Sequence, residues 1–383
     1  MYHETLVIGG GIAGMSCALE LKEAGRDVAI VTDELGGRVC YEPEYGSNFG
    51  AVFFMENYTH AKKLLKDKGV MAPKLGDLML HSSPTKVFKG NSLTMLASLP
   101  QMNRFTRFMN HEFIPEYNQY KKECETQPVA VVMDRHPKLK RYYQMKASEL
   151  IHELGIDKIC DNFVSKFAYA CTGSRIDELN ALDFLNVAQG VVIPIFDFSF
   201  DREEFTRTLD GKVYIDTIVS IERVEGDPKV NWKAIGRDGT DYTCLNMVIA
   251  ATGLVNQKLL GIEEIRQPTR LLSYLVEGTA KPYIAKASAH YFSDQFDIIA
   301  INKRSDGRFN VYSRTDIDLN QYFDNPKIIH YRDWPEALFT YGDIVQPQDF
   351  DDHLWIASDI NGLGLEPAAI SGVYAANRIL GRA

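Results

Sequence analysis

Three kinds of pattern are absent from this sequence of 383 residues. No C-x-x-C pair and no compact cluster of cysteine with histidine occurs, so we expect no metal site and no redox pair; the cysteines are Cys17, Cys40, Cys124, Cys160, Cys171 and Cys244. The net charge is −9 and no dense run of lysine and arginine occurs, which argues against nucleic acid as a partner. No stretch approaches about 18 continuous apolar residues, so we expect no membrane-spanning helix, whereas peripheral contact with a membrane stays open.

The composition is that of an ordinary folded protein. Hydrophobic residues make up 45% and charged residues 24% of the chain, which excludes disorder and low-complexity fibres. The first predicted strand begins within about five residues of Met1, which leaves no room for a signal peptide. We therefore expect a cytoplasmic protein with reduced, mostly buried thiols, Cys40 among them. Nothing in the sequence sets its oligomeric state.

The N-terminal segment predicts a β-α-β unit, "ETLVIGGGIAGMSCALELKEAGRDVAIVTD". We expect a strand at 5–8, a helix that runs to Ala24 and is closed by Gly25, and a second strand at 28–32. No second Gly-rich β-α-β turn follows. One dinucleotide is therefore predicted, which excludes reductases that bind NAD(P)H on a Rossmann unit of its own.

Three glycines lie between the first strand and the helix. Gly9 would allow a tight turn, Gly11 the close approach of a pyrophosphate, and Gly14 the packing of the helix against the strand. The free N–H groups at the start of the helix would face the anion. The spacing and its position between strand and helix predict a dinucleotide site.

The predicted secondary structure changes twice along the middle of the chain, from helices to short strands and then to a second strand-rich segment. From about 55 to 200 the pattern predicts helices with aromatic stripes, which we interpret as core; the stripe residues are Phe105, Phe108, Phe113, Tyr117 and Tyr120, with Phe196, Phe198 and Phe200 on a later strand. Residues 205–262 predict short strands, including a hairpin with an "RDG" turn and a separate buried strand in "MVIAATG". Residues 263–345 are again rich in strands, and the chain closes with a strand, a Gly-rich loop and a helix.

Several motifs together resemble the flavin-dependent amine oxidase superfamily, which also holds phytoene desaturases, protoporphyrinogen oxidases and renalases. They are the Gly-rich turn, "LGGRV" at 35–39, the strand that ends at Asp359, and "EPAAISG" at 366–372. The resemblance implies an α/β fold with a Rossmann-type FAD-binding domain and an inserted, discontinuous α+β substrate domain. The boundaries expected are 1–58, 203–262 and 346–383 for the FAD-binding domain, and 59–202 and 263–345 for the substrate domain with its helical insert.

The resemblance also implies which residues bind FAD. Gly9, Gly11, Ile12, Ala13 and Gly14 would hold the pyrophosphate, and Gly37 and Arg38 would lie near the phosphates or the flavin. Val219 would give a backbone contact to adenine, and Asp359 would reach the ribityl or phosphate region. Gly364, Leu365 and Ala368 would lie at the isoalloxazine ring, where a helix beginning at Pro367 would direct its positive end toward the ring.

The adenosine ribose raises a question, because relatives usually end the second strand in an acidic residue. Counting eighteen residues from Gly14 as relatives do places Thr32 there, and a neutral hydroxyl bond is weaker than a bond to a carboxylate. The link to "LGGR" is also two residues shorter than usual, which would draw Asp33 toward the ribose. Our hypothesis is that Asp33 binds the ribose, with Thr32 and Glu34 as alternatives.

Two departures from the superfamily pattern bear on the chemistry. Gly364 stands where monoamine-type oxidases place a tyrosine of their aromatic cage, and no cysteine follows Cys244. We therefore expect noncovalent FAD and an oxidoreductase that removes a hydride from an uncharged, largely apolar small molecule. The flavin would accept the hydride. No catalytic residue is assigned; Tyr331, Trp334 and Tyr341 are candidates for the pocket wall only.

The sequence leaves other functions open. One is an oxidase of amines or, like renalases, of dihydronicotinamides. Another is a non-redox flavin isomerase that resembles UDP-galactopyranose mutase, although no arginine pair lies beside a Gly-rich segment. The last is a flavin-binding protein without turnover.

Overall fold

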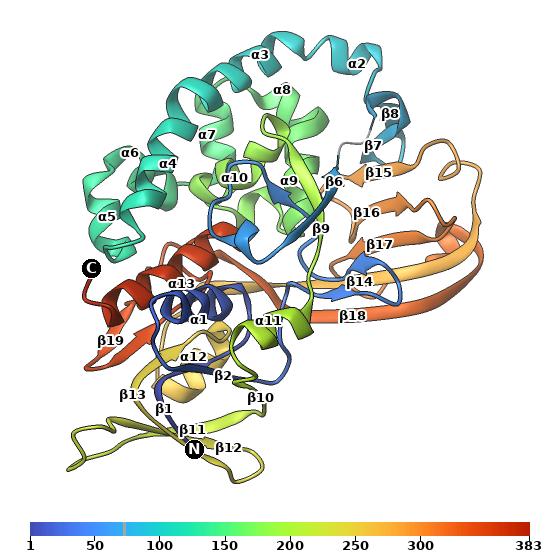
Figure 1. Ribbon diagram of the computed structural model, residues 1–383. Helices are drawn as coiled ribbons and strands as arrows, with labels where there is room; N and C mark the ends of the chain where they lie inside the picture. Colours follow the sequence, from blue (N-terminus) through green and yellow to red (C-terminus); the bar gives the residue numbers. More distant parts are fainter. Residues whose placement is uncertain (72–73) are drawn as a thin grey trace.

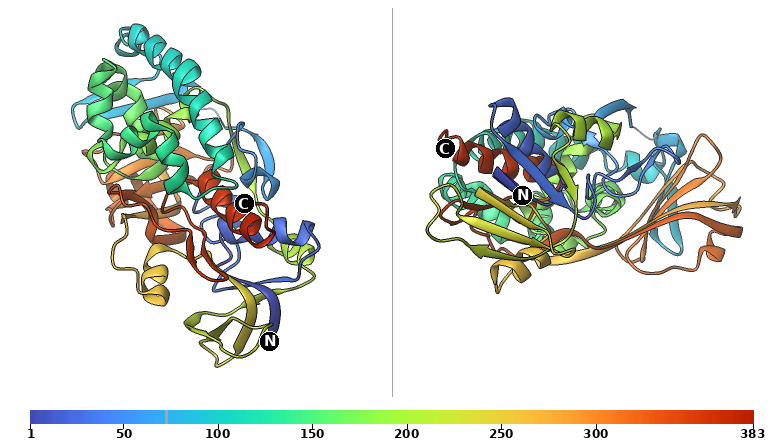
Figure 2. Two further views of the ribbon diagram at one scale, coloured as in Figure 1. Left: turned by 90° about the vertical axis from the view of Figure 1, so that its left-hand side faces the viewer. Right: turned by 60° about the horizontal axis from the view of Figure 1, so that its bottom comes forward.

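The computed structural model describes residues 1–71 and 74–383, apart from the side chain of Tyr341. Figure 1 shows three parts: a sheet with α1 and α13 in the lower half, a second sheet at the right, and a group of helices at the top. The two turned views in Figure 2 show the same separation of helices and sheets. No described helix has the length and apolar character needed to cross a membrane.

The first sheet is largely parallel and contains the predicted β-α-β unit. Its order is β10-β2-β1-β13-β12-β11, and β20 also pairs with β13 and carries β19 at its edge. The strands are β1 Tyr2–Ile8, β2 Val28–Thr32, β10 Val213–Ile215, β11 Ile218–Arg223, β12 Trp232–Gly236, β13 Asp241–Ile249, β19 Asp349–Asp351 and β20 Leu354–Ile356. Strands β10, β2, β1, β13 and β20 run parallel, so their carboxyl ends meet at one edge.

The predicted hairpin is present, but the strand after it is not separate. β12 and β13 pair antiparallel around the "RDG" turn. The residues of "MVI" are the end of β13, because one long strand pairs with β12 near its start and with β1 along most of its length.

Helices α1 (Ile12–Glu23) and α13 (Leu365–Ile379) pack side by side (Figure 1). A Cβ atom at Gly372 would overlap the carbonyl oxygen of Ala13, so the contact needs glycine. The predicted start of α13 at Pro367 is wrong: the helix begins at Leu365 after Gly364, whose φ of 103° turns the chain into it. Pro367 thus lies in the first turn, where its missing N–H costs no helical hydrogen bond.

The second sheet has the order β18-β14-β17-β16-β15-β7-β8. Its strands are β7 Leu78–Ser83, β8 Lys86–Lys89, β14 Gln267–Ala280, β15 Ala289–Phe292, β16 Ile298–Lys303, β17 Phe309–Ser313 and β18 Phe323–Tyr341. The long antiparallel pair β14 and β18 runs from the first sheet to the second (Figure 1). Two small sheets complete the fold, with strands β3 Tyr41–Glu42, β4 Ser47–Asn48, β5 Phe54–Met55, β6 Lys66–Val70 and β9 Ile195–Ser199.

The helical insert covers one side of the molecule. It comprises α2 Leu93–Leu96, α3 Leu99–Phe108, α4 Ile114–Glu123, α5 Val129–Arg135, α6 Pro137–Gln144, α7 Ala147–Glu153, α8 Asp157–Ile159, α9 Ser165–Thr172 and α10 Ala181–Ala188; α11 Arg202–Thr208 and α12 Gly253–Leu260 lie outside it. The aromatic stripe of α3 and α4 is buried in the main core cluster, as predicted. The insert therefore packs into a core that it shares with α1 and α13.

The contact between α1 and α13 predicts the effect of Gly372→Ala. The added methyl group would push the helices apart, and overpacking of this kind costs roughly 1–3 kcal/mol of unfolding free energy. Urea unfolding of the apoprotein measures the loss. The control is Gly11→Ala, whose Cβ would meet no atom within 4 Å; equal stability of the two variants would contradict the prediction.

Candidate FAD and substrate site

A cavity of about 710 Å³ lies at the carboxyl edge of the first sheet and extends toward the second. We call one part the dinucleotide half; it is lined by residues 8–39, 216–259 and 358–368. The other part, the substrate half, is lined by residues 51–71, 167–195 and 271–312. Residues 334–338 lie at the cavity as well, and the Glu336 carboxylate accepts a hydrogen bond from the Leu254 N–H of α12 at 3.2 Å.

The glycine turn has the shape of an anion cradle. Gly9 has a φ of 110° and lies against the Ala250 backbone, whereas Gly11 faces open space, so a phosphate could approach its backbone. Gly11 is the N-cap of α1 without a side-chain hydrogen bond, and Ile12 and Ala13 line the cavity with the free N–H groups of the first turn. The residues present therefore fit a pyrophosphate.

Two glycines of the turn serve packing. Gly14 does not line the cavity; a Cβ there would overlap the Gly9 carbonyl oxygen and would lie 3.1 Å from the side chains of Val7 and Ala250 on the strands beneath the helix. Gly10 was missed in the sequence, and a Cβ on it would lie 2.8 Å from Thr32. The signal was the glycine between Gly9 and Gly11 in "GGG", which the G-x-G spacing leaves unspecified.

The ribose candidates differ in what their side chains already bind. The Thr32 hydroxyl donates to the Glu34 carbonyl oxygen at 3.0 Å and is buried. The Asp33 carboxylate is exposed at the end of the cavity and accepts a hydrogen bond from the Thr217 hydroxyl. Asp33 therefore has unused acceptor capacity at the cavity, in line with the hypothesis.

Val219 lies away from the cavity. Its side chain is 38% exposed, whereas its neighbours Thr217 and Ile218 line the dinucleotide half. Side chains alternate along a strand, so the start of β11 turns Ile218 inward and Val219 outward.

Arg38 and Asp359 come together although 321 residues separate them in the chain. The guanidinium binds both carboxylate oxygens, at 2.7 and 2.8 Å, and also donates to the Ala337 carbonyl at 2.6 Å. Both residues line the cavity. Because the two charges compensate each other, this pair adds little net charge to the cavity. Gly37, with a φ of 54°, brings the same loop against Gly11.

The loop before α13 is held by the helical insert. The Asn186 side-chain amide donates to the Leu363 carbonyl at 2.6 Å, and the Asp183 carboxylate accepts from the Leu363 N–H at 3.3 Å. Asp183 also pairs with the fully buried Arg266, which donates to the Ile360 carbonyl at 3.2 Å. These contacts fix the backbone at the cavity, and no local sequence pattern marks them.

Glu366 fixes the other side of the same helix start. Its buried carboxylate accepts four hydrogen bonds, from the N–H groups of Thr59, His60 and Ala61 and from the Thr59 hydroxyl. Gly364, Leu365 and Ala368 consequently face the cavity, together with the free N–H groups of the first turn.

The described lining of the substrate half contains no Asp, Glu, Lys, Arg or His. Burial raises the pKa of the Tyr291 and Tyr312 hydroxyls and of the Cys171 thiol, so these groups stay neutral. Apolar side chains form most of the wall, including Phe53, Met55, Met71, Phe167, Val187, Leu271 and Ile299. This half suits an uncharged ligand.

The predicted wall aromatics have different positions. Trp334 lines the cavity and donates from its indole N–H to the Phe49 carbonyl at 2.6 Å. Tyr331 is 40% exposed and does not line it. The side chain of Tyr341 lies outside the described residues.

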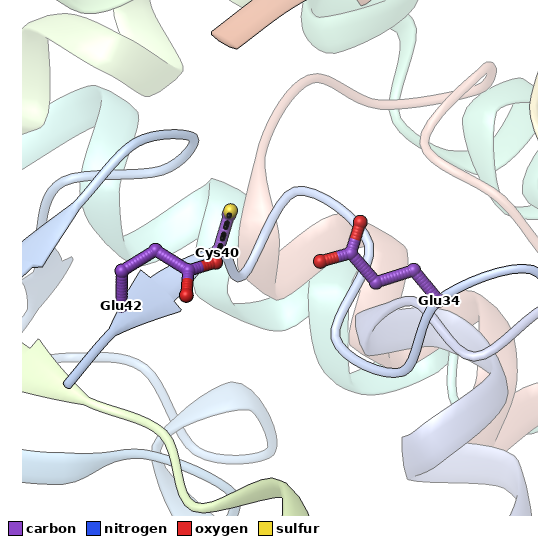
Figure 3. A group of neighbouring side chains, drawn as sticks. All are labelled: Glu34, Cys40 and Glu42. Carbon is purple, nitrogen blue, oxygen red and sulfur yellow. Dashed lines mark hydrogen bonds between the residues drawn. The ribbon is translucent and has the colours of Figure 1, made fainter. Parts of the chain in front are cut away.

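Cys40 lies in a small polar cluster with Glu34 and Glu42 (Figure 3). Its sulfur is 3.5 Å from a Glu42 oxygen, and burial raises its pKa to about 11. Arg202 lies 3.3 Å from both carboxylates, and Arg332 lies 2.9 Å from Glu34. The two arginines already neutralise the carboxylates, so the cluster is an ion-pair network rather than a cation site.

The N-terminal segment and the fold both resemble those of known FAD-binding proteins. Residues 4–39 match the family model described as "FAD binding domain". The fold is that of the flavin-dependent amine oxidases and their relatives, as the motifs predicted. No curated protein sequence matches the chain.

Three solved structures illustrate the likeness. A putrescine oxidase variant has a TM-score of 0.71 at 12% identity, with 100% of both chains covered. Cyclohexylamine oxidase from Brevibacterium oxydans has 0.66 at 14% identity, with 99% of both chains covered. A fatty acid isomerase from P. acnes that produces CLA has 0.68 at 13% identity, with 99% of this chain and 98% of that chain covered.

These matches confirm the predicted fold class and the predicted FAD cofactor. They also support the prediction of an FAD-dependent oxidoreductase. The noncovalent attachment of FAD, the domain boundaries and the roles of single residues stay predictions.

Gly11 gives a test of the cradle. The variant Gly11→Ala should unfold at the same urea concentration as the wild-type apoprotein, because its Cβ meets no atom within 4 Å. It should bind FAD more weakly, since the methyl group would occupy the approach of the phosphates. Fluorescence titration with FAD measures the affinity, and unchanged affinity would remove Gly11 from the site.

The ribose hypothesis is tested by Asp33→Ala. Loss of a hydrogen bond to a charged group costs about 1.5–3 kcal/mol, which corresponds to a roughly 10- to 150-fold weaker affinity for FAD. The matched variant is Thr32→Val, which should leave the affinity close to the wild-type value because that hydroxyl already binds Glu34. If Asp33→Ala binds FAD as tightly as the wild type, the assignment is wrong.

Proposed function

We propose that this protein is an FAD-dependent oxidoreductase that removes a hydride from an uncharged, largely apolar small molecule. The observation that carries the proposal is the absence of any charged side chain from the described lining of the substrate half. An unpaired charge is costly to bury in such surroundings, so a charged substrate would lack compensation there. A neutral substrate would not meet this penalty.

The residues of the chain would bind and orient rather than transfer protons. Apolar side chains such as Phe167 and Leu271 would exclude water, and the helix start at Leu365 would place a positive dipole end at the cavity. When bound, FAD supplies the hydride acceptor. Asp183, Asn186 and Glu366 would hold the backbone that faces it.

An amine substrate is supported less well. Gly364 has a φ of 103°, a conformation in which a tyrosine would be strained, so a cage wall at this position is disfavoured. The substrate half also offers no described carboxylate to a protonated amine.

A second candidate is a flavin-dependent isomerase of an apolar molecule. The fold it shares with a fatty acid isomerase favours this alternative. A diphosphate sugar is a poorer ligand, because no arginine lines the described substrate half.

Anaerobic mixing of the oxidised holoprotein with candidate substrates tests the proposal. An uncharged polyene should bleach the visible flavin band, whereas a primary amine or a dihydronicotinamide should not. Product formation only with pre-reduced protein would favour the isomerase. No response to any class would favour a flavin-binding protein without turnover.

The pH dependence of this reduction provides a separate prediction. Tyr291, Tyr312 and Cys171 have a raised pKa, so each stays protonated as the pH rises toward the ordinary values of about 8.5 for thiols and 10 for phenols. The bleaching rate should therefore be constant from about pH 6 to about pH 8.5. Stopped-flow absorbance measures it, and a sigmoidal rise within that range would indicate an ionising substrate or base.

A further inference from the structure

The substrate half has a wall formed by the second sheet, and the register of its strands places two tyrosines on either side of one alanine. Tyr291 of β15 pairs with Ala300 of β16, and Ala300 pairs with Tyr312 of β17. All three line the cavity. Neighbouring strands lie about 4.8 Å apart, so the two tyrosine backbones are separated by roughly 10 Å, with the small methyl group of Ala300 between them.

A third polar residue follows on the same face. Asn302 lies two residues beyond Ala300 on β16, so its side chain is on the same side of the sheet, and it also lines the cavity. Ser273 of β14 pairs with Tyr312, but its hydroxyl already donates to the Phe49 carbonyl at 2.7 Å. We call Tyr291, Tyr312 and Asn302 the polar row.

The polar row has no described protein partner, although it faces the cavity. Buried tyrosines elsewhere differ among themselves: Tyr58 and Tyr117 also make no side-chain hydrogen bond to a described residue, whereas three others do. Tyr143, Tyr169 and Tyr374 donate to Ile344, Phe296 and Asp349 at 3.0, 2.6 and 2.7 Å. The side chains of Tyr291, Tyr312 and Asn302 make no hydrogen bond to any residue that the structure describes. Polar groups in such surroundings normally have a partner, so an occupant of the cavity would supply it.

The chemistry of the row defines that occupant. A phenol at neutral pH and an amide can each donate a hydrogen bond, and a carbonyl oxygen has two lone pairs to receive them. No described cation lines this half to balance a carboxylate. We propose that the polar row holds the oxygen of a neutral carbonyl group carried by an otherwise apolar substrate. This inference rests on the proposed function in placing the substrate in this half of the cavity.

The test uses a pair of probes that differ only in the polar atom, 2-decalone and 2-methylidenedecalin. Their dissociation constants are measured on the oxidised holoprotein without oxygen, from the change in the flavin band and from ligand-observed NMR. The wild type should bind the ketone more tightly. Tyr291→Phe and Tyr312→Phe should each weaken ketone binding about 2- to 10-fold, as expected for a neutral hydrogen bond, and leave the alkene unchanged.

Tyr169→Phe is the matched control, because it removes a buried hydroxyl whose acceptor is the Phe296 carbonyl rather than a cavity ligand. It should lower the stability of the protein and leave the preference for the ketone intact. The two cavity variants should keep wild-type stability, because each removes a hydroxyl without a protein partner.

An equal affinity for both probes in the wild type, or an unchanged ketone preference in the double variant Tyr291→Phe/Tyr312→Phe, would overturn the proposal. Failure of both probes to bind would overturn it as well. Binding is measured without turnover, so the ketone preference would still be observed if the proposed hydride transfer were wrong. A polyene would still bleach the flavin band if the polar row had no role. The two proposals can therefore fail independently.

Discussion

The close contact between α1 and α13 is the constraint on which the cavity depends. Gly372 allows the two helices to approach backbone to backbone at Ala13. Both helices begin at the cavity, and neither start has a side-chain cap. Two sets of free N–H groups therefore face one space and contribute a positive potential to it. FAD suits this arrangement because it carries negative charge at its pyrophosphate and gains charge at its ring on reduction.

The buried polar contacts around Leu363 explain why the helical insert is integral to the site. Removing the Asp183 and Arg266 charges from water is expensive, and such a pair is tolerated only where additional hydrogen bonds satisfy both groups. Two of those bonds go to the backbone at Ile360 and Leu363, in the loop before Gly364, and Arg266 also donates to the Thr340 carbonyl at 2.9 Å. The pair thus contributes less to the general stability of the fold than to fixing one conformation of this loop. Movement of α10 would be transmitted to the start of α13.

The sequence predicted features that depend on neighbouring residues better than those that depend on distant ones. The bounds of β2 match the predicted 28–32, and the hairpin and the glycine turn occur as expected, because periodicity and turn residues act locally. The start of α13 was placed two residues late because proline is a common first helical residue, whereas the positive φ of Gly364 sets the boundary. Asp183 and Asn186 were not foreseen. Their roles depend on partners brought close by the tertiary fold, and no pattern in their own segments marks them.

The two halves of the cavity achieve recognition by different physical means. The dinucleotide half uses backbone N–H groups and glycine, so its specificity comes from shape and from helix dipoles. The substrate half has few polar atoms, and an apolar wall distinguishes molecules that differ by one methylene by only about 1–3 kcal/mol. A buried hydrogen-bonding group discriminates more strongly, because the wrong ligand leaves it unpaired. Selectivity in this half should therefore depend on Tyr291, Tyr312 and Asn302 more than on the larger apolar surface around them.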